Sequence, residues 1–272
     1  MKTFLDTILE DVREEVAASK LRRTPADLRS MCADAPPPRD FRSSLAGGFG
    51  LIAEIKERSP SVGPMRRENV ADAPVVYAES PVVRAVSVLT NERHFGMSIE
   101  RLASVRKIVA QPVLRKDFFI DEYQIREARA FGADAILLMA NVLDSARLAG
   151  FHSLARELGI EALFEVHTKA EISQLPPSAR IVGINSRKFK SDSGFVASGE
   201  SSDQDFSLDL SVFQLADALP TGVIRVAESG ISPKTMGSVR DKFDAALVGT
   251  SLLRDERGIR ACLADFESAI GA

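Results

Sequence analysis

The stretch Leu51-Ile52-Ala53-Glu54-Ile55-Lys56 decides the fold of this chain. It is a short apolar run in which charges appear near the end, at every second position. Because side chains alternate between the two faces of a strand, Glu54 and Lys56 point the same way. The apolar side chains at positions 51, 53 and 55 then point toward helices that cover the strand. The stretch therefore predicts a buried strand that ends in charged groups.

Apolar runs of this kind recur along the chain, separated by amphipathic stretches. The predicted strands are residues 51–56, 82–89, 112–116, 135–139, 161–165, 180–184, 223–227 and 245–248. The predicted helices between them are 70–79, 98–109, 122–131, 145–158, 169–174, 208–218, 233–242 and a short turn from 250. Strands that alternate with helices indicate a parallel sheet, and eight such units in about 220 residues predict a closed (β/α)8 TIM barrel.

An open, doubly wound sheet is the competing architecture. It calls for a glycine-rich turn after its first strand, with an acidic residue about 20 positions further on. Residues 57–63 read Glu-Arg-Ser-Pro-Ser-Val-Gly instead, which disfavours that fold. Before the barrel, helical patterns at 4–20 and 25–32 end at three prolines, 36–38. We expect one domain, with an N-terminal helical extension at 1–48 packed on a barrel at 49–272.

Composition narrows the class of protein. Of the 272 residues, 45% are apolar and 27% charged, which suits a globular protein with a sizeable core. The net charge of −3 provides no basic stripe for nucleic acid. The distant Cys32 and Cys262 form no disulfide framework, and the three scattered histidines have no metal-ligand spacing. No apolar run reaches about 18 residues, so we expect no membrane contact. The two separate cysteines indicate reduced thiols in a cytoplasmic protein, which we expect to be a monomer or weak homo-oligomer.

One connection is long and rich in glycine and serine, at residues 188–207. Loops longer than about 12–15 residues are usually functional lids or disordered insertions. The composition favours an insertion over a lid, and both interpretations stay open.

Polar groups follow several of the predicted strands. They are Glu54, Lys56, Lys116, Glu165, Asn185 and Glu228. Each alone is equally well explained as a solvated charge at the end of a strand. Together they would meet at the carboxyl-terminal mouth of a barrel, shift one another's pKa values and supply general acids and bases. The set predicts proton-transfer chemistry on a small anion.

A phosphate site is predicted from separate positions. Ser229-Gly230 follows the seventh strand and Gly249-Thr250 follows the eighth, where barrels commonly bind phosphate through backbone N–H groups and a helix N-terminus. Ser59, after the first strand, adds a hydroxyl donor. Ordinary turns and helix caps are the alternative for each loop taken singly. Asp117 and Asp121 are interpreted as a helix-start cluster rather than a metal pair.

At these residues the chain resembles the indole-3-glycerol phosphate synthase family, from about Phe4 to its C-terminus. The resemblance rests on Pro38-Arg39-Asp40-Phe41, Ile52-Ala53-Glu54-Ile55-Lys56, Ser59-Pro60-Ser61, Gly63, Ser87-Val88-Leu89-Thr90, Pro112-Val113-Leu114-Arg115-Lys116-Asp117-Phe118, Tyr123-Gln124-Ile125, residues 132–138, Glu165-Val166-His167, Gly183-Ile184-Asn185-Ser186-Arg187, Glu228-Ser229-Gly230-Ile231 and Val248-Gly249-Thr250. It implies closure and decarboxylation of the phosphorylated small molecule 1-(2-carboxyphenylamino)-1-deoxyribulose 5-phosphate to indole-3-glycerol phosphate, with loss of water and without a cofactor.

The resemblance also implies roles for the residues. Lys116 becomes the acid that protonates the ketone oxygen. Lys56 pairs with the substrate carboxylate and assists dehydration, while Glu54 and Glu165 orient it or exchange protons with it. Glu228 and Asn185 hold hydroxyl groups. The remaining residues bind the substrate. Phe118 and Leu137 pack against the anthranilate ring, and Arg187 is a further substrate-binding residue. The phosphate is held by Ser59, Ser229, Gly230, Gly249 and Thr250. Which glutamate is the base stays open.

The chain departs from the family pattern within residues 75–98. The segment before the second strand lacks the usual Gly-Ala pair, and His94-Phe95-Gly96 carries its glycine one place early. These changes lie near the expected anthranilate side of the pocket. Two alternatives therefore stay open: a paralogue that acts on a modified anthranilate–ribulose phosphate, and a catalytically silent barrel subunit. The preceding isomerase of the pathway is disfavoured, because it needs a cysteine after the first strand.

Overall fold

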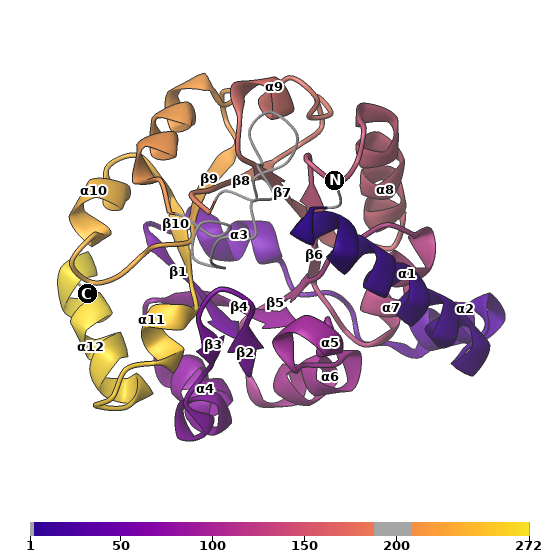
Figure 1. Ribbon diagram of the computed structural model, residues 1–272, viewed down its shortest axis with the longest axis horizontal. Helices are drawn as coiled ribbons and strands as arrows, with labels where there is room; N and C mark the ends of the chain where they lie inside the picture. The colour runs from indigo at the N-terminus through magenta and orange to yellow at the C-terminus, as the bar shows by residue number, and fades with distance from the viewer. Residues whose placement is uncertain (1–2, 188–207, 272) are drawn as a thin grey trace.

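The computed structural model describes residues 3–187 and 208–271, and in these ranges parallel strands close into an eight-stranded barrel (Figure 1). The barrel strands are β1 (Gly50–Ile55), β4 (Val83–Leu89), β5 (Val113–Lys116), β6 (Ala135–Met139), β7 (Glu161–Val166), β8 (Ile181–Asn185), β9 (Ile224–Glu228) and β10 (Ala245–Val248). The order around the barrel follows the chain, and β1 pairs with both β4 and β10. The predicted barrel is confirmed, with strand ends within a residue or so of the expected positions.

Helices form the outer ring between the strands. They are α4 (Arg67–Glu79), α5 (Glu92–Phe95), α6 (Ile99–Ile108), α7 (Glu122–Ala130), α8 (Ser145–Glu157), α9 (Lys169–Ile172), η2 (Leu210–Ala218), α10 (Met236–Arg240), α11 (Thr250–Leu253) and α12 (Ile259–Ile270). A small antiparallel ribbon of β2 (Arg58–Ser59) and β3 (Gly63–Pro64), which the sequence did not predict, follows β1. In the described part of the chain, none of the helices is both long and apolar enough to cross a membrane.

One helical prediction was wrong, and one helix was not predicted. Residues 210–218 form a 3-10 helix rather than an α-helix, and their buried side chains, Phe213 and Ala216, are three positions apart. That spacing places both on one face at three residues per turn. The short turn expected from residue 250 is followed by the full helix α12, which buries Ile259, Cys262 and Phe266. These residues are three and four positions apart, which is a helical pattern. The prediction did not use it.

The core has two layers, one inside the barrel and one between barrel and helices. Ile52 points inward and packs in the inner cluster, whereas Leu51, Ala53 and Ile55 pack in the outer cluster with Val70 of α4 and other helix residues. The period-two interpretation of the first strand is therefore confirmed. Inward positions near the carboxyl ends of the strands are left for polar side chains.

The N-terminal extension supplies three helices: α1 (Phe4–Arg22), α2 (Pro25–Asp34) and α3 (Phe41–Ala46). Helix α3 directly precedes β1, contacts β4 and β9, and adds Phe41 and Leu45 to the inner cluster. It closes the amino end of the barrel. Before it, the guanidinium of Arg39 donates to the carbonyls of Val109 and Gln111, both at 2.8 Å. Helix α2 packs on α7, and α1 crosses the side of the mouth (Figure 1).

Candidate active site

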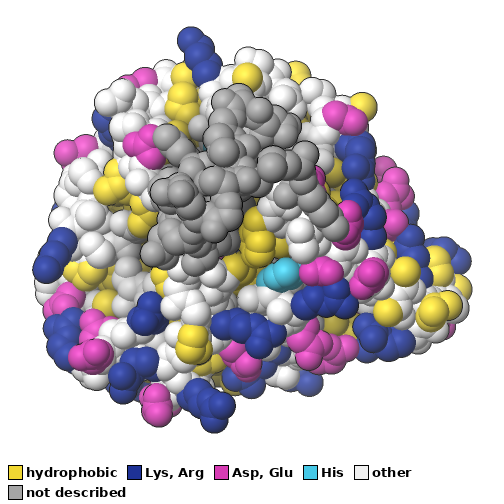
Figure 2. Space-filling view, viewed as in Figure 1, with side chains coloured by type: hydrophobic (Ala, Val, Ile, Leu, Met, Phe, Trp, Pro, Cys, Tyr) yellow, Lys and Arg dark blue, Asp and Glu magenta, His cyan; other side chains and the backbone are white. Residues whose placement is uncertain are grey.

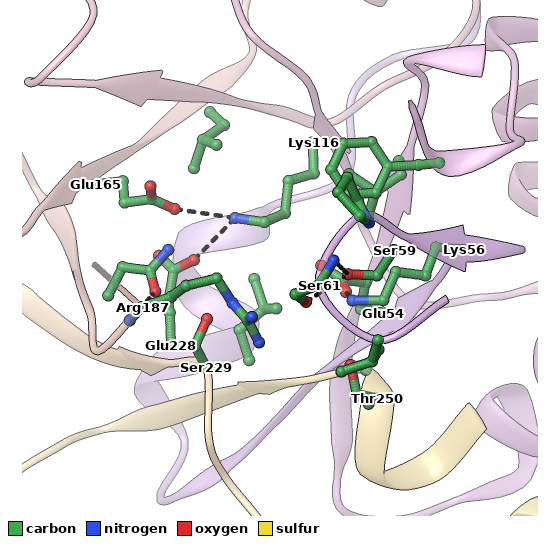
Figure 3. Close-up of a pocket in the computed structure, with 18 of the residues that line it drawn as sticks. Glu54, Lys56, Ser59, Ser61, Lys116, Glu165, Arg187, Glu228, Ser229 and Thr250 are labelled. Atoms are coloured by element: carbon green, nitrogen blue, oxygen red, sulfur yellow. Dashed lines mark hydrogen bonds and ion pairs between the residues drawn. The ribbon is translucent and has the colours of Figure 1, made fainter. Parts of the chain in front are cut away.

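The carboxyl ends of the strands surround one cavity of about 300 Å³, and every site residue predicted from the sequence lines it. These residues are Glu54, Lys56, Ser59, Lys116, Phe118, Leu137, Glu165, Asn185, Arg187, Glu228, Ser229, Gly230, Gly249 and Thr250. They come from strands that are far apart in sequence, and the closed barrel brings them together (Figure 3). Their chemical roles remain predictions.

Lys116 lies at the centre of the polar groups. Its Nζ donates to Oε2 of Glu165 at 3.0 Å and to Oε2 of Glu228 at 2.9 Å (Figure 3). These residues end β5, β7 and β9, and alternate strands of a barrel place their side chains in the same inner layer. Both carboxyl groups are buried, each with 1% of its side-chain surface exposed. One ammonium thus lies between two buried carboxyls, and its single charge balances only one of them.

Burial disfavours the charged form of all three groups, and the neighbouring charges decide in which direction each pKa moves. For Lys116, burial is outweighed by Glu165 and Glu228, so its pKa is raised and it stays protonated. For Glu165, burial is outweighed by Lys116 and then His167, which lower its pKa to about 2. For Glu228, burial outweighs Lys116, and Glu165 adds repulsion, so its pKa rises to about 8. Glu165 is therefore the more readily ionised of the two carboxyls, and Glu228 is the one that more readily holds a proton.

A second ion pair lies on β1 and just after it. Nζ of Lys56 donates to Oε1 of Glu54 at 2.5 Å, so the two side chains share one face as predicted. The pair needs the glycine that follows β10, because a Cβ on Gly249 would stand 2.4 Å from Oε1 of Glu54. Gly249 therefore makes room for a charged side chain in addition to its predicted role at the phosphate.

The predicted phosphate end gathers hydroxyl groups and exposed backbone. Oγ of Ser59 lies 2.9 Å from Oγ of Ser61, in the turn of the β2–β3 ribbon. Ser229 and Gly230 have φ angles of 67° and 68°, which turn the chain sharply after β9. The hydroxyl of Ser251 donates to the carbonyl of Ile231 at 2.5 Å and ties this turn to the start of α11. Consecutive residues of positive φ open backbone N–H groups toward an anion.

The apolar side of the cavity extends beyond the prediction. Phe118 and Leu137 line it, and so do Phe95, Phe4 and Ile8. The last two belong to α1, which the sequence placed only as an extension packed on the barrel. The buried positions of α1 follow a helical spacing, so the sequence carried the signal of a buried face. It gave no sign that this face covers the site.

Salt bridges and a hydrogen bond hold α1 beside the mouth. Asp11 lies 2.8 Å from Nε2 of His94, and Glu15 accepts from the amide of Asn91 at 3.1 Å. Further along the helix, Lys20 pairs with Asp121 at 2.7 Å. Figure 2 shows basic and acidic side chains mixed along this edge of the face. His94 belongs to the loop that departs from the family pattern, and here that loop anchors α1.

The two aspartates near Lys116 differ in role. Asp121 is the N-cap of α7, as expected, and accepts from the N–H of Tyr123. Asp117 was wrongly placed at a helix start: its Oδ2 pairs with Arg115 at 3.0 Å and accepts from Thr90 at 2.6 Å. Arg115 points away from the site and also pairs with Glu127 at 3.0 Å. This buried network packs against β5 on the side away from the cavity. The charges at 115 and 117 in the sequence did not indicate that they pair with each other.

Within the described ranges, no group of three or more acidic, cysteine or histidine side chains is placed to hold a metal ion. The glycine- and serine-rich segment 188–207 lies outside the described residues. Its flanks are described: Arg187 and Leu208 form an isolated antiparallel bridge, and Arg187 reaches the cavity.

A closed (β/α)8 barrel with buried acid–base groups at its strand ends, next to loops suited to phosphate, defines a barrel enzyme that acts on a small phosphorylated molecule. The family model described as indole-3-glycerol phosphate synthase matches residues 5–262. The chain belongs to this family.

Curated relatives agree with the family. An indole-3-glycerol phosphate synthase of Mycobacterium avium is 38% identical over 274 residues, covering 98% of this chain and 94% of its own. One from Micrococcus luteus is 40% identical over 275 residues, with 95% and 96% covered. "Indole-3-glycerol phosphate synthase 2" of Streptomyces coelicolor is 38% identical over 260 residues, with 93% and 95% covered.

Solved structures show the same fold at low identity. The 3-hexulose-6-phosphate synthase of Salmonella typhimurium superposes with a TM-score of 0.56 and 13% identity, covering 82% of this chain and 98% of its own. The N-(5'-phosphoribosyl)anthranilate isomerase of Pyrococcus furiosus gives 0.53 and 12%, covering 81% and 98%. These likenesses support the barrel and carry no statement about activity.

Proposed function

We propose that this chain is a carboxy-lyase of tryptophan biosynthesis that converts 1-(2-carboxyphenylamino)-1-deoxyribulose 5-phosphate to indole-3-glycerol phosphate. Family membership supports the reaction. The observation that carries the assignment of roles is the position of Lys116 between Glu165 and Glu228, at 3.0 and 2.9 Å. That arrangement supplies an ammonium, a carboxylate and a neutral carboxyl around one point in the cavity.

The first step is ring closure, with Lys116 as general acid. The aromatic carbon that bears the carboxylate attacks the ketone carbon, and the ketone oxygen takes a proton from Nζ of Lys116 as its double bond opens. Carbon dioxide then leaves, and the bonding electrons restore the aromatic ring. The pKa of Lys116 is raised, so it is protonated before the reaction begins. The product of this step carries a hydroxyl group that must still be lost.

The second step is dehydration, which needs an acid at the hydroxyl and a base at the proton that is removed. We assign the base to Glu165, because its pKa of about 2 keeps it ionised at neutral pH. Glu228, with a pKa of about 8, donates a hydrogen bond to a hydroxyl group instead. Lys56 serves as the acid that assists loss of water, and Glu54 orients it at 2.5 Å.

Binding is divided between the two sides of the cavity. Backbone and hydroxyl groups of Ser59, Ser229, Gly230, Gly249 and Thr250 hold the phosphate. Phe118 and Leu137 pack on the anthranilate ring, where the exclusion of water strengthens the pairing of Lys56 with the substrate carboxylate. Asn185 and Arg187 hold the polar centre between the two ends. No cofactor takes part.

The test is a fluorescence assay for indole-3-glycerol phosphate formed from synthetic substrate. We expect product with the unaltered chain and a fall of at least about a thousandfold in kcat with Lys116→Ala. Lys242→Ala is the matched control, because Lys242 pairs with Asp217 on the outside of the barrel. No product from folded, unaltered protein contradicts the function. Near-full turnover by Lys116→Ala contradicts only the assignment of the acid.

A paralogue that processes a modified anthranilate is the second candidate. The departures at residues 75–98 favour it, since Phe95 of that region lines the cavity. A series of ring-substituted substrates tests this: a substituted ring with a higher kcat/KM than the unsubstituted one supports the paralogue. A silent subunit predicts no turnover of any of them.

The remaining properties follow from the same class of enzyme. We propose a single domain with the helical extension at 1–48 and the barrel at 49–272. The protein acts in the cytoplasm as a monomer or weak homo-oligomer, and it binds no nucleic acid. Sedimentation of the purified chain over a range of concentrations tests the oligomeric state.

A further inference from the structure

His167 lies directly behind the acid–base group and was assigned no role. It follows β7 two positions after Glu165, so the two side chains leave the strand on the same side. Its Nε2 stands 3.6 Å from Oε1 of Glu165, the oxygen that does not contact Lys116. His167 is not among the described residues that line the cavity. Any influence it has on the reaction passes through Glu165.

The other ring nitrogen faces a second carboxylate. Nδ1 of His167 lies 3.3 Å from Oε2 of Glu171, and the backbone N–H of His167 donates to the same oxygen at 2.7 Å. The second oxygen of Glu171 accepts from the hydroxyl of Thr168 at 3.1 Å. Glu171 is therefore held in place by several donors of the turn that begins α9.

This geometry fixes the protonation state of the ring. A neutral imidazole donates through one nitrogen and presents a lone pair at the other. Ionised carboxylates only accept, so a neutral ring would set a lone pair against either Glu165 or Glu171. The imidazolium donates to Glu171 through Nδ1 and faces Glu165 with its second N–H in an ion pair at 3.6 Å, which removes the conflict. Among the described residues, the carboxyl groups that act on the ring are Glu171 of α9, Glu165 of β7 and Glu228 of β9.

We infer that His167, as an imidazolium held by Glu171, is a positioning residue that orients Glu165 on Lys116 and keeps this carboxylate ionised. The inference rests on the proposed role of Glu165 as base. It adds a reason why Glu165 and Glu228, which share one lysine, differ in charge: a second cation stands beside Glu165. The pKa of His167 agrees, since burial lowers it but Glu171 and Glu165 outweigh burial and raise it.

The first test reads the ring directly and needs no activity. The chain has three histidines, so 15N-histidine labelling gives few signals, and spectra of His167→Gln and His152→Gln assign them. We expect the imidazolium pattern for His167 at pH 7. We expect a neutral ring for His152, whose pKa is lowered by burial. A neutral His167 at pH 7 overturns the inference.

The second test measures kcat against pH. His167→Leu removes the cation beside Glu165, so the acidic limb of kcat should move to higher pH by about one unit or more. At pH 7 Glu165 stays ionised in both proteins, so we expect kcat to fall about tenfold because the carboxylate is no longer held in position on Lys116. KM should stay within about twofold, because the ring binds no substrate. His167→Gln retains a donor without charge and should fall between. Glu171→Gln should shift the limb in the same direction by less.

His152→Gln is the matched control. His152 belongs to α8, is also buried, and packs edge-on against Phe164 on the outer face of β7, at 5.1 Å between ring centroids. Its variant should keep the acidic limb of the unaltered protein. If His167→Leu fails to fold, Glu171→Gln carries the test. A folded His167→Leu with an unchanged acidic limb overturns the inference. An inactive unaltered chain refutes the proposed function, while the NMR result still stands alone.

Discussion

Gly183 of β8 lies so close to Glu228 of β9 that a Cβ on it would stand 1.9 Å from Oε1 of the carboxyl. Real Cβ atoms do not approach a carboxyl oxygen so closely, so only glycine leaves Glu228 in its place beside Lys116. The glycine has no special φ angle here. Its role is to provide space for a buried acid.

Gly183→Ala should therefore impair the reaction more than the fold. The added methyl group displaces Glu228 by an ångström or so, and displacement of that size typically costs about a hundredfold in kcat. Overpacking should lower the free energy of unfolding by about 1–3 kcal/mol. Steady-state kinetics and chemical denaturation measure the two effects. Gly150→Ala on α8, where a Cβ meets nothing within 4 Å, should keep full activity.

Ile8→Ala tests whether α1 forms part of the binding site. Ile8 is buried and lines the cavity, so truncating it should weaken apolar contact and raise KM several-fold, with kcat little changed. Leu9→Ala is the control, because the neighbouring side chain borders a different, outer groove. Equal KM values for the two variants would remove α1 from the site.

Ser229 allows strain and binding to be separated. It is the one non-glycine with positive φ in the described part of the chain, at 67°. Ser229→Gly removes the strain and the hydroxyl, and should raise the free energy of unfolding by about 1 kcal/mol. Ser229→Ala removes the hydroxyl alone. If the hydroxyl binds phosphate, KM should rise equally in both variants, and only the glycine variant should be more stable.

Glu15 gives a prediction for stability against pH. Burial, then repulsion from Asp117, raises its pKa from 4.5 to about 7. Its contribution is fully present below pH 4.5 and is lost as pH rises through about 7. Glu15→Gln keeps an acceptor for Asn91 and does not ionise. After allowance for partial exposure, it should be more stable than the unaltered chain by about 1 kcal/mol at pH 8 and equal at pH 4.

Thermal or urea unfolding of both chains at the two pH values measures this difference. The sign of the stability difference at pH 8 decides whether ionised Glu15 destabilises or stabilises the fold. A variant that is less stable at pH 8 would show that ionised Glu15 holds α1 in place, contrary to the prediction.

Patterns along single strands predicted most of the fold and most of the site residues. Alternation at Glu54 and Lys56 indicated the inward face of β1, because a strand's two faces are set by its own sequence. Positions directly after predicted strands indicated the distant members, such as Asn185 and Thr250, because the barrel leaves few places for a side chain there to point. Resemblance to a family added Phe118, Leu137 and Arg187.

What the sequence did not reveal depends on contacts between elements. The apolar spacing of α1 indicates a buried face and says nothing of what the face covers, so Phe4 and Ile8 were missed. The requirement for glycine at 183 arises from the neighbouring strand. Asp117 pairs with Arg115 because both side chains point to the same side of β5. The nearby Asp121 suggested instead that Asp117 belongs to the start of a helix.

The first and last strands of the barrel, β1 and β10, pair with each other, so the site is complete only after both have been made. Glu54 leaves the ribosome well before Gly249, against which it packs. Until β10 joins, β1 has β4 on one side and an unpaired edge on the other. Glu228 on β9 is likewise added late. A partly made chain can hold finished helices and strands but no working pocket, so activity begins only when the barrel closes.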